Sequence, residues 1–413
     1  MRTIDLTEWE SSDPIPLSAG ELTELVGLRD ELKLTIEPAG GPDGRYILRP
    51  SSTVGALDLG GLSVAIHPKL PIGRVLNLAS WAMGSPRTVT FRPESFDFTG
   101  EPTLVEALAP MLAHAARRAF ARGLLHGYRT EEEGLTTIRG RIRVDDQIRR
   151  RFGVPIPVEV RYDDFTEDIL PNRLVKAAAH RLSRLRLQAR QSRRDLGAIR
   201  ATLDKVSPVE FPRNAVPEVR FNGMNEHYRE VVTLARLILR YTSIETGRGR
   251  VRANGFLMDM NVVFQEFVTR ALRDELRLTE SAFPSDRKLP RRIFLDQDSE
   301  VRLRPDLSWW NGSTCTFVGD AKYKRVEHKT VPNADLYQLL AYTTALDLPG
   351  GLLVYAEGEP GSTVHQVAHA GKRLEVTTVD LSGSIDDLHG EIRTLAGTVQ
   401  ALRHQAAKRR QAA

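Results

Sequence analysis

One short stretch of the sequence combines two carboxylates with a lysine. It reads LRPDLSWWNGSTCTFVGDAKYK. Asp320 and Lys322 are two residues apart, so in a strand both side chains leave the same face of the sheet. Asp306 lies at the end of the preceding predicted strand, and a turn at Asn311 and Gly312 returns the chain toward the same edge. We therefore expect Asp306, Asp320 and Lys322 to converge.

Such a set has the composition of a site for metal-dependent phosphodiester cleavage. Carboxylate oxygens hold Mg²⁺, which polarises a phosphate and lowers the pKa of a bound water. A lysine orients that water and stabilises charge that develops on the phosphate. An isolated D-x-K pair in a strand is more often a salt bridge across the sheet face, so the pair alone does not decide between these interpretations.

A second pair of polar residues follows in DLYQLLAY. Gln338 and Tyr342 are four residues apart and therefore share one face of a predicted helix. The leucines of this segment can serve the core, which leaves Gln338 and Tyr342 to face the active edge. The ordered set P-D, D-x-K and Q-x-x-x-Y favours catalysis over a structural role.

Composition limits the class of protein. The 413 residues exceed one ordinary domain, and 41% hydrophobic and 27% charged residues predict two or three folded units. A net charge of +5 permits a polyanionic partner without establishing one. The single cysteine, Cys315, excludes an internal disulfide and a Cys-cluster zinc site. Without an apolar run of about 20 residues or a signal-like start, we expect a cytoplasmic protein that does not bind membranes.

Hydrophobic periodicity indicates an α/β fold in two regions that meet near residues 245–255. The first, residues 1–245, is β-rich and then helical, with predicted helices at about 104–125, 172–203 and 225–241. The second, residues 250–413, has a mixed α/β order, with predicted helices at about 260–276 and 335–346 and strands near 301–307, 314–321 and 351–355. The sheet of the second region would carry the carboxylates and the lysine.

The predicted helix 172–203 carries six arginines and no acid between Arg181 and Arg194. These side chains could follow DNA phosphates or contact an acidic face of a partner. They could also form a salt-bridged surface, because the leucines among them suffice to anchor one side of the helix. We favour the partner or structural use.

The motif order resembles the PD-(D/E)xK nuclease superfamily in its RecB-like branch. More closely, the chain resembles the McrC family, the nuclease subunits of modification-dependent McrBC restriction systems. The resemblance extends from about residue 60 to residue 355, where these segments occur in the family's order: IHPKLP, LTTIRGRI, YDDFTEDILPNRLVKAA, FLMDMNVVFQEFV and VGDAKYK. It implies that residues 250–413 form a PD-(D/E)xK endonuclease domain, a mixed sheet flanked by helices.

The resemblance also assigns roles. It implies an Mg²⁺-dependent endonuclease in which Asp306 and Asp320 hold the metal, and Lys322, Gln338 and Tyr342 complete the active site.

One position departs from the family pattern. The family usually has a glutamate directly after the phenylalanine of FLMDMNVVFQEFV, whereas here Phe264 is followed by Gln265 and then Glu266. A shift of one residue rotates a side chain by about 100° around a helix, so Glu266 cannot simply replace that acid. Gln265 offers a neutral carbonyl oxygen, which is a weaker metal ligand.

The resemblance further implies a partner. McrC proteins act with McrB, an AAA+ GTPase ring that recognises double-stranded DNA carrying modified cytosine, and their N-terminal part inserts into the ring and stimulates GTP hydrolysis. The sequence lacks GxxxxGK[ST], so we expect the partner to bind the GTP. Residues 1–245 would bind the partner, and 128–162 would form the inserting finger, where Arg139 and Arg141 could stabilise charge during phosphoryl transfer. A solvated basic hairpin is an equal alternative.

Two other functions stay open. The chain could be a nuclease of the same fold in another antiphage defence assembly. It could also be a non-catalytic adaptor that activates a GTPase. Intact Asp306, Asp320 and Lys322 argue against the adaptor, whereas Gln265 keeps it open.

Overall fold

The computed structural model describes most of the chain, namely residues 2–40, 44–59, 61–84, 91, 102–152, 154–244, 254–326, 331–358 and 363–412. The chain divides into two compact units. The first comprises Met1–Gly55, Val64–Ser95 and Leu257–Ala413, and the second Ala56–Ser63 and Phe96–Phe256. Residues 1–55 and 64–95 therefore fold with the C-terminal region, whereas the rest of the predicted first region forms the second unit. This division differs from a single boundary near residues 245–255. Residues 245–253 of that boundary lie outside the described residues.

A five-stranded mixed sheet forms the centre of the C-terminal part of the first unit. Its strand order is β14-β15-β16-β18-β17. The strands are β14 (Leu307–Asn311), β15 (Thr314–Val326), β16 (Gly350–Gly358), β17 (Thr363–Gln366) and β18 (Arg373–Thr378). β14 and β15 form an antiparallel hairpin, and Gly312 adopts a φ of +61° in its turn, a conformation that glycine reaches without steric cost. β15, β16 and β18 run parallel, which confirms the predicted α/β class.

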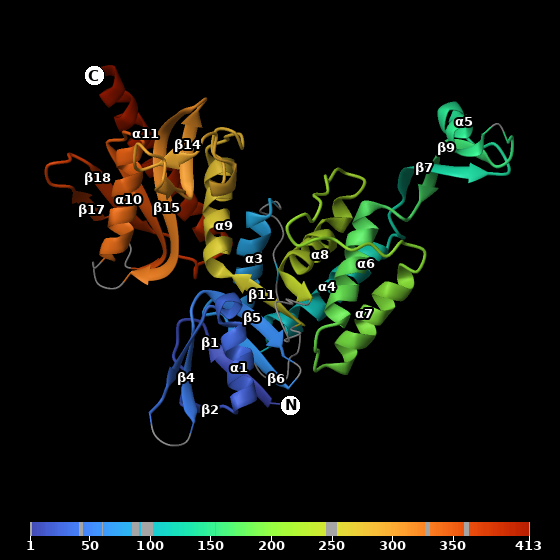
Figure 1. Ribbon diagram of the computed structural model, residues 1–413, viewed down its shortest axis with the longest axis horizontal. Helices are drawn as coiled ribbons and strands as arrows, with labels where there is room; N and C mark the ends of the chain where they lie inside the picture. Colours follow the sequence, from blue (N-terminus) through green and yellow to red (C-terminus); the bar gives the residue numbers. More distant parts are fainter. Residues whose placement is uncertain are drawn as a thin grey trace. The chain divides into compact units, whose positions relative to one another are not determined.

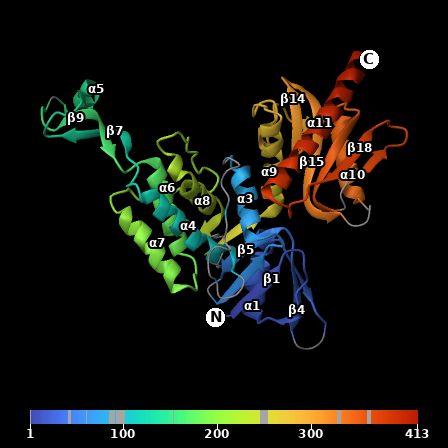
Figure 2. The same ribbon diagram turned by 180° about the vertical axis from the view of Figure 1, so that it is seen from behind.

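Helices cover both faces of this sheet. They are α9 (Met260–Glu275), α10 (Asn333–Ala345) and α11 (Ile385–Ala412). α10 lies on one face, while α9 and α11 lie on the other (Figures 1 and 2). Side-chain contacts agree with this arrangement, because Lys322 on β15 contacts α10, whereas the ring of the next residue, Tyr323, lies 6.1 Å from that of Phe264 on α9. The alternation of a strand thus separates the polar edge from an aromatic core.

The N-terminal elements of the first unit supply further support for α9. Helix α3 packs along α9, and the ring centroids of Trp81 and Phe267 are 5.1 Å apart. The N-terminal strands and helices are β1 (Arg2–Thr7), β2 (Ile15–Pro16), α1 (Ala19–Gly27), α2 (Arg29–Leu32), β3 (Leu34–Pro38), β4 (Arg45–Pro50), β5 (Thr53–Asp58), β6 (Leu62–His67) and α3 (Ile72–Ala82). A second five-stranded sheet has the order β1-β6-β5-β11-β10, with β10 (Thr242–Ile244) and β11 (Asn254–Asp259).

The second unit is mainly helical. Its helices are α4 (Leu104–Phe120), α6 (Leu170–Ser183), α7 (Arg190–Thr202) and α8 (Arg229–Tyr241). The 3₁₀ turn Glu226–Tyr228 directly precedes α8. A projection extends from these helices (Figure 1) and consists of β7 (Gly127–Leu135), β8 (Arg141–Ile142), α5 (Val144–Arg151) and β9 (Val158–Thr166). None of the helices in the described ranges is long and apolar enough to cross a bilayer.

The continuous helix predicted for residues 172–203 is wrong. The structure has α6 and α7 instead, separated by residues 184–189. Leu185 and Leu187 lie in this break, and both are buried. Residues two apart point in nearly opposite directions from a helix, so a helical backbone could not place both leucines in one core. Packing of the two leucines thus overrides the helical propensity of the segment.

Candidate active site

The structure brings the predicted carboxylates together at one edge of the sheet. Asp306 does not end a strand as expected; it immediately precedes β14, while the earlier strand β13 (Arg302–Leu303) has already ended. The hairpin register pairs Leu307 with Gly319, so Asp306 and Asp320 extend from neighbouring positions of adjacent strands. Oδ2 of Asp306 also accepts a hydrogen bond from the main-chain N–H of Ala321, at 3.1 Å. The strand pairing therefore sets the approach of the two acids.

A chain of hydrogen bonds orients the lysine beside them. The ammonium of Lys322 lies 2.5 Å from Oδ2 of Asp320 and donates to Oε1 of Gln338 at 2.9 Å. Nε2 of Gln338 donates to the hydroxyl oxygen of Tyr342 at 2.7 Å, and that hydroxyl donates to the carbonyl of Arg304 at 3.1 Å. The predicted pair on α10 thus positions the lysine from the helix side.

Burial and mutual repulsion disfavour two charged carboxylates here. Burial first, and then the charge of Asp320, raise the pKa of Asp306 to about 8. Burial also raises the pKa of Asp320, which is 1% exposed. For Lys322, burial lowers the pKa, but the charge of Asp320 and its ion pair more than offset this, so the pKa lies above its usual value. The lysine therefore stays protonated at neutral pH.

These features fit a divalent cation. Oδ2 of Asp320 is buried, and the Lys322 ammonium is its ion-pair partner. A cation beside Asp306 and Asp320 would add positive charge and favour the charged forms of both acids. In the part of the chain that the structure describes, no three His, Cys, Asp or Glu side chains are grouped to hold a metal. Any further ligands of such a cation would have to be other oxygen donors, such as amide or main-chain carbonyl oxygens or water.

Gln265 is the predicted source of one such oxygen. It lies on α9, one turn before Thr269, whose hydroxyl is 3.4 Å from the main-chain oxygen of Asp306. The start of α9 is fixed by Asp259, which caps the helix and forms an ion pair of 2.7 Å with Lys33. No hydrogen bond joins the Gln265 side chain to either aspartate among the described residues, so its role stays a prediction.

Asp335 is a residue near this site that the sequence argument missed. It is buried in the first turn of α10, pairs with Lys324 at 2.7 Å and accepts a hydrogen bond of 2.6 Å from the Tyr355 hydroxyl. Lys324 follows Lys322 by two residues, and Asp335 precedes Gln338 by three. These spacings place Lys324 on the strand face of Lys322 and Asp335 on the helix face of Gln338, and they could have predicted that Asp335 lies near the site.

The comparison with family models decides the identity of the chain. The model described as McrBC 5-methylcytosine restriction system component matches residues 48–356, well over half of the sequence. The chain belongs to the McrBC family. It is therefore a component of an McrBC-type restriction system, and the predicted family resemblance is confirmed.

One solved structure shows the same fold as this McrBC-family chain. A chain from the assembly of Thermococcus gammatolerans McrB AAA+ hexamers with bound McrC is 19% identical, has a TM-score of 0.58, and is matched over 96% of this chain and 100% of that one. A chain of the Thermococcus gammatolerans McrBC complex is 21% identical with a TM-score of 0.43, over 66% of this chain and 88% of that one. No curated protein matches the sequence.

The projection of this McrBC-family protein contains the two predicted arginines, and they differ in environment. Arg139 stacks on the ring of Tyr162, 4.1 Å from its centroid, and Nη2 donates to Asp164 at 2.7 Å. Arg141 is exposed and has no side-chain partner among the described residues. Gly140 separates them with a φ of +73°, and a Cβ there would lie 2.3 Å from the carbonyl of Arg161. The Arg139 side chain is thus held by contacts within the hairpin, whereas the exposed Arg141 side chain could contact another molecule.

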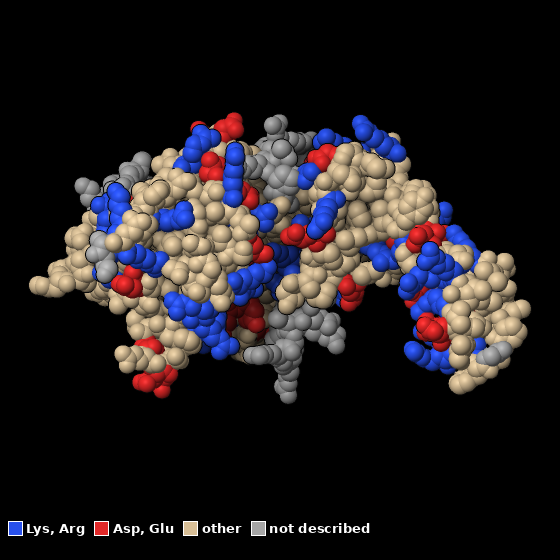
Figure 3. All heavy atoms as spheres, turned by 90° about the horizontal axis from the view of Figure 1, so that it is seen from above, with Lys and Arg blue, Asp and Glu red and all other residues tan. Residues whose placement is uncertain are grey.

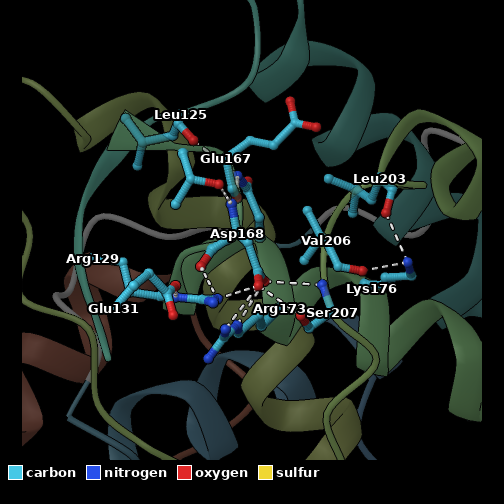
Figure 4. Close-up of polar contacts among 12 residues, drawn as sticks. Leu125, Arg129, Glu131, Glu167, Asp168, Arg173, Lys176, Leu203, Val206 and Ser207 are labelled. Carbon is cyan, nitrogen blue, oxygen red and sulfur yellow. Dashed lines mark hydrogen bonds and ion pairs between the residues drawn. The ribbon is translucent and has the colours of Figure 1, made fainter. Parts of the chain in front are cut away.

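A buried carboxylate fixes the base of the projection (Figure 4). Asp168 follows β9 and accepts hydrogen bonds from Arg173 on α6 at 2.7 and 2.8 Å, from Ser207, and from Arg129 on β7. The bonds from Arg173 are the largest cause that holds the pKa of Asp168 well below its usual value, against the opposing effect of burial. Both long strands of the projection are therefore tied to the helices by one charged group.

Proposed function

We propose that this chain is the nuclease subunit of its restriction system, an Mg²⁺-dependent endonuclease that cuts DNA carrying modified cytosine. The convergence of Asp306, Asp320 and Lys322 is the observation that carries the proposal. A buried acid pair with raised pKa values is costly for a purely structural site, and a metal ion would relieve that cost. The neighbouring Gln338 and Tyr342 support the same interpretation.

Each residue would have a definite role in hydrolysis. Asp306 and Asp320 would hold Mg²⁺, with Gln265 as a neutral third ligand, and the bound ion would polarise the scissile phosphate and activate water. Lys322 would place its positive charge against the phosphate, where negative charge increases during the reaction. Gln338 and Tyr342 would keep the lysine in place, as their hydrogen-bond chain indicates.

The proposed partner is an AAA+ GTPase ring of the McrB type, which would bind the GTP. The Thermococcus gammatolerans assembly contains McrB AAA+ hexamers with bound McrC, which supports this choice. On the present chain the projection is the surface suited to it, because large apolar side chains are exposed there: Ile138, Ile142, Val144, Ile148, Phe152, Val154 and Ile156. At the right-hand end of Figure 3, charged side chains of both signs adjoin a face that carries neither. Such a face suits insertion into a partner.

Cleavage by the reconstituted complex tests this function. Supercoiled plasmid with modified cytosine would be incubated with the chain, its GTPase partner, GTP and Mg²⁺. Asp320→Asn should abolish cutting while GTP hydrolysis stays at the parent rate. Asp347→Asn is the matched control, because Asp347 is an exposed residue beyond the end of α10, and it should cut like the parent. If Asp320→Asn cut at the parent rate, the candidate site would not be the nuclease site. The alternative of a non-catalytic adaptor that activates the GTPase would then be favoured.

A further inference from the structure

The second unit contains a cavity of about 410 Å³ that has no role in the function above. It lies between α6 and the segment of residues 209–213, beside the start of β10. Its polar and charged lining includes His180, Arg181, Arg184, Glu210 and Arg213. Three guanidinium groups and a histidine therefore face one carboxylate. The cavity carries an excess of positive charge and lies outside the candidate nuclease site.

Main-chain carbonyls hold two of these arginines in place. Arg181 donates to the carbonyl of Leu239 at 2.8 Å and to that of Phe211. Nε of Arg213 donates to the carbonyl of Arg240 at 3.2 Å. Both arginines thus interact with the C-terminal end of α8, where a positive charge is favourable. A guanidinium fixed in this way loses little further side-chain entropy when it binds an anion.

Unlike Arg181 and Arg213, Arg184 has no side-chain hydrogen bond to the end of α8 among the described residues. This residue follows α6, lines the cavity, is exposed, and has no side-chain partner among the residues that the structure describes. The positive environment also affects His180, because burial first, and then the charges of Arg200 and Arg184, lower its pKa. A bound anion would offset the repulsion among these groups.

We propose that this cavity binds a phosphate group of a nucleic-acid backbone. Guanidinium groups match phosphate oxygens in geometry and charge. Among the described residues, the lining includes no aromatic side chain on which a nucleobase could stack, so the site suits a backbone phosphate better than a nucleotide. Further exposed arginines without a partner among the described residues add positive charge to the chain that follows Arg184: Arg186, Arg190, Arg193 and Arg194.

The proposal rests on the proposed function only in taking DNA as the polyanion. It assigns the helical unit a contact with substrate backbone, in addition to any contact made by the nuclease site. Because phosphate contacts carry no sequence information, this contact would position DNA rather than select a site.

Equilibrium binding of DNA tests the proposal without any cleavage. The full-length chain would be titrated into a short fluorescein-labelled duplex in EDTA, and anisotropy would be followed at several salt concentrations. Arg184→Glu should weaken binding several-fold and reduce the slope of log K against log salt by about 1. Arg184→Lys should retain most of the affinity, because it keeps the charge. Arg122→Glu is the control, since Arg122 is an exposed arginine of the same unit outside the cavity.

The alternatives give different outcomes. Equal effects of Arg184→Glu and Arg122→Glu on duplex binding would overturn the proposal. So would an Arg184→Glu variant that binds duplex like the control but loses the GTPase partner in gel filtration, because the cavity would then contact a protein acid. The proposal would also be overturned if Arg184→Glu weakened the binding of labelled GDP and left the binding of duplex unchanged. An Arg184-dependent duplex affinity in a chain that never cuts would support this inference and reject only the proposed function.

Discussion

The hydroxyl of Tyr323 donates a hydrogen bond of 2.9 Å to Oε1 of Glu8, a carboxylate with no exposed surface. Tyr323 lies between Lys322 and Lys324 on β15. The same Oε1 accepts the main-chain N–H of Lys69 at 2.8 Å, in the IHPKLP segment. Residues near the N-terminus therefore support the strand that carries the candidate active site. A nuclease fragment that began near residue 250 would lose part of its own core.

Tyr323→Phe should lower the free energy of unfolding by about 1–3 kcal/mol, because it removes a donor from a buried carboxylate. Tyr337→Phe is the matched control, since Tyr337 is 67% exposed and should change stability by less than about 0.5 kcal/mol. Urea unfolding followed by circular dichroism measures both variants. Equal stabilities would mean that the Glu8 contact contributes nothing.

The stability of the metal-free chain should depend on Asp306. Because its pKa is about 8 in the folded protein and about 4 in an unfolded chain, the folded state binds the extra proton between these values. Stability from this group is therefore full below about pH 4 and is lost as the pH rises through about 8. Unfolding in EDTA at several pH values, with Asp306→Asn as reference, isolates this dependence. Parallel profiles for the two proteins would refute the assignment.

Gln265→Glu should reduce the Mg²⁺ concentration for half-maximal cleavage, because a charged oxygen binds a hard cation more strongly than an amide does. The measurement is an Mg²⁺ titration of cleavage by the reconstituted complex. Glu266→Gln provides the comparison at the neighbouring position and should leave the titration unchanged. Loss of activity in Gln265→Glu would instead indicate that Gln265 packs structurally and that the metal uses two acids only.

The two arginines of the projection should separate in function. Arg141→Ala should reduce the partner's GTP turnover, as stimulated by this chain, by about tenfold or more while the complex still forms, as expected for a charge that acts in the transition state. Arg139→Ala should mainly weaken complex formation, because Arg139 stabilises the hairpin through Tyr162 and Asp164. Arg149→Ala, an exposed arginine on α5, is the control. Phosphate release and gel filtration measure turnover and binding, and parent turnover in Arg141→Ala would assign activation to another residue.

The polar set of the site could be predicted from sequence because local geometry determines it. Residues two apart in a strand, such as Asp320 and Lys322, share a face, and so do Gln338 and Tyr342 on a helix. The predicted strand near residues 301–307 placed Asp306 at the end of a strand, whereas it precedes one. The predicted turn at Gly312 nevertheless brings Asp320 beside Asp306. The α/β class followed from the same periodicities.

Long-range packing could not be predicted. Glu8 and Tyr323 are 315 positions apart, and neither segment contains a pattern that refers to the other. For the same reason, the folding of N-terminal residues with the C-terminal sheet was missed. The break between α6 and α7 depends on the burial of Leu185 and Leu187, which a single-sequence helical pattern does not reveal.

The central claim is that Asp306 and Asp320 form a binding site for a divalent cation. Titration of Mn²⁺ into the full-length chain, with free Mn²⁺ followed by electron paramagnetic resonance, tests it directly. The account predicts that the parent and Asp347→Asn bind Mn²⁺ in competition with Mg²⁺, and that Asp306→Asn and Asp320→Asn lose this binding while remaining folded. Unchanged Mn²⁺ binding in folded Asp320→Asn would contradict it.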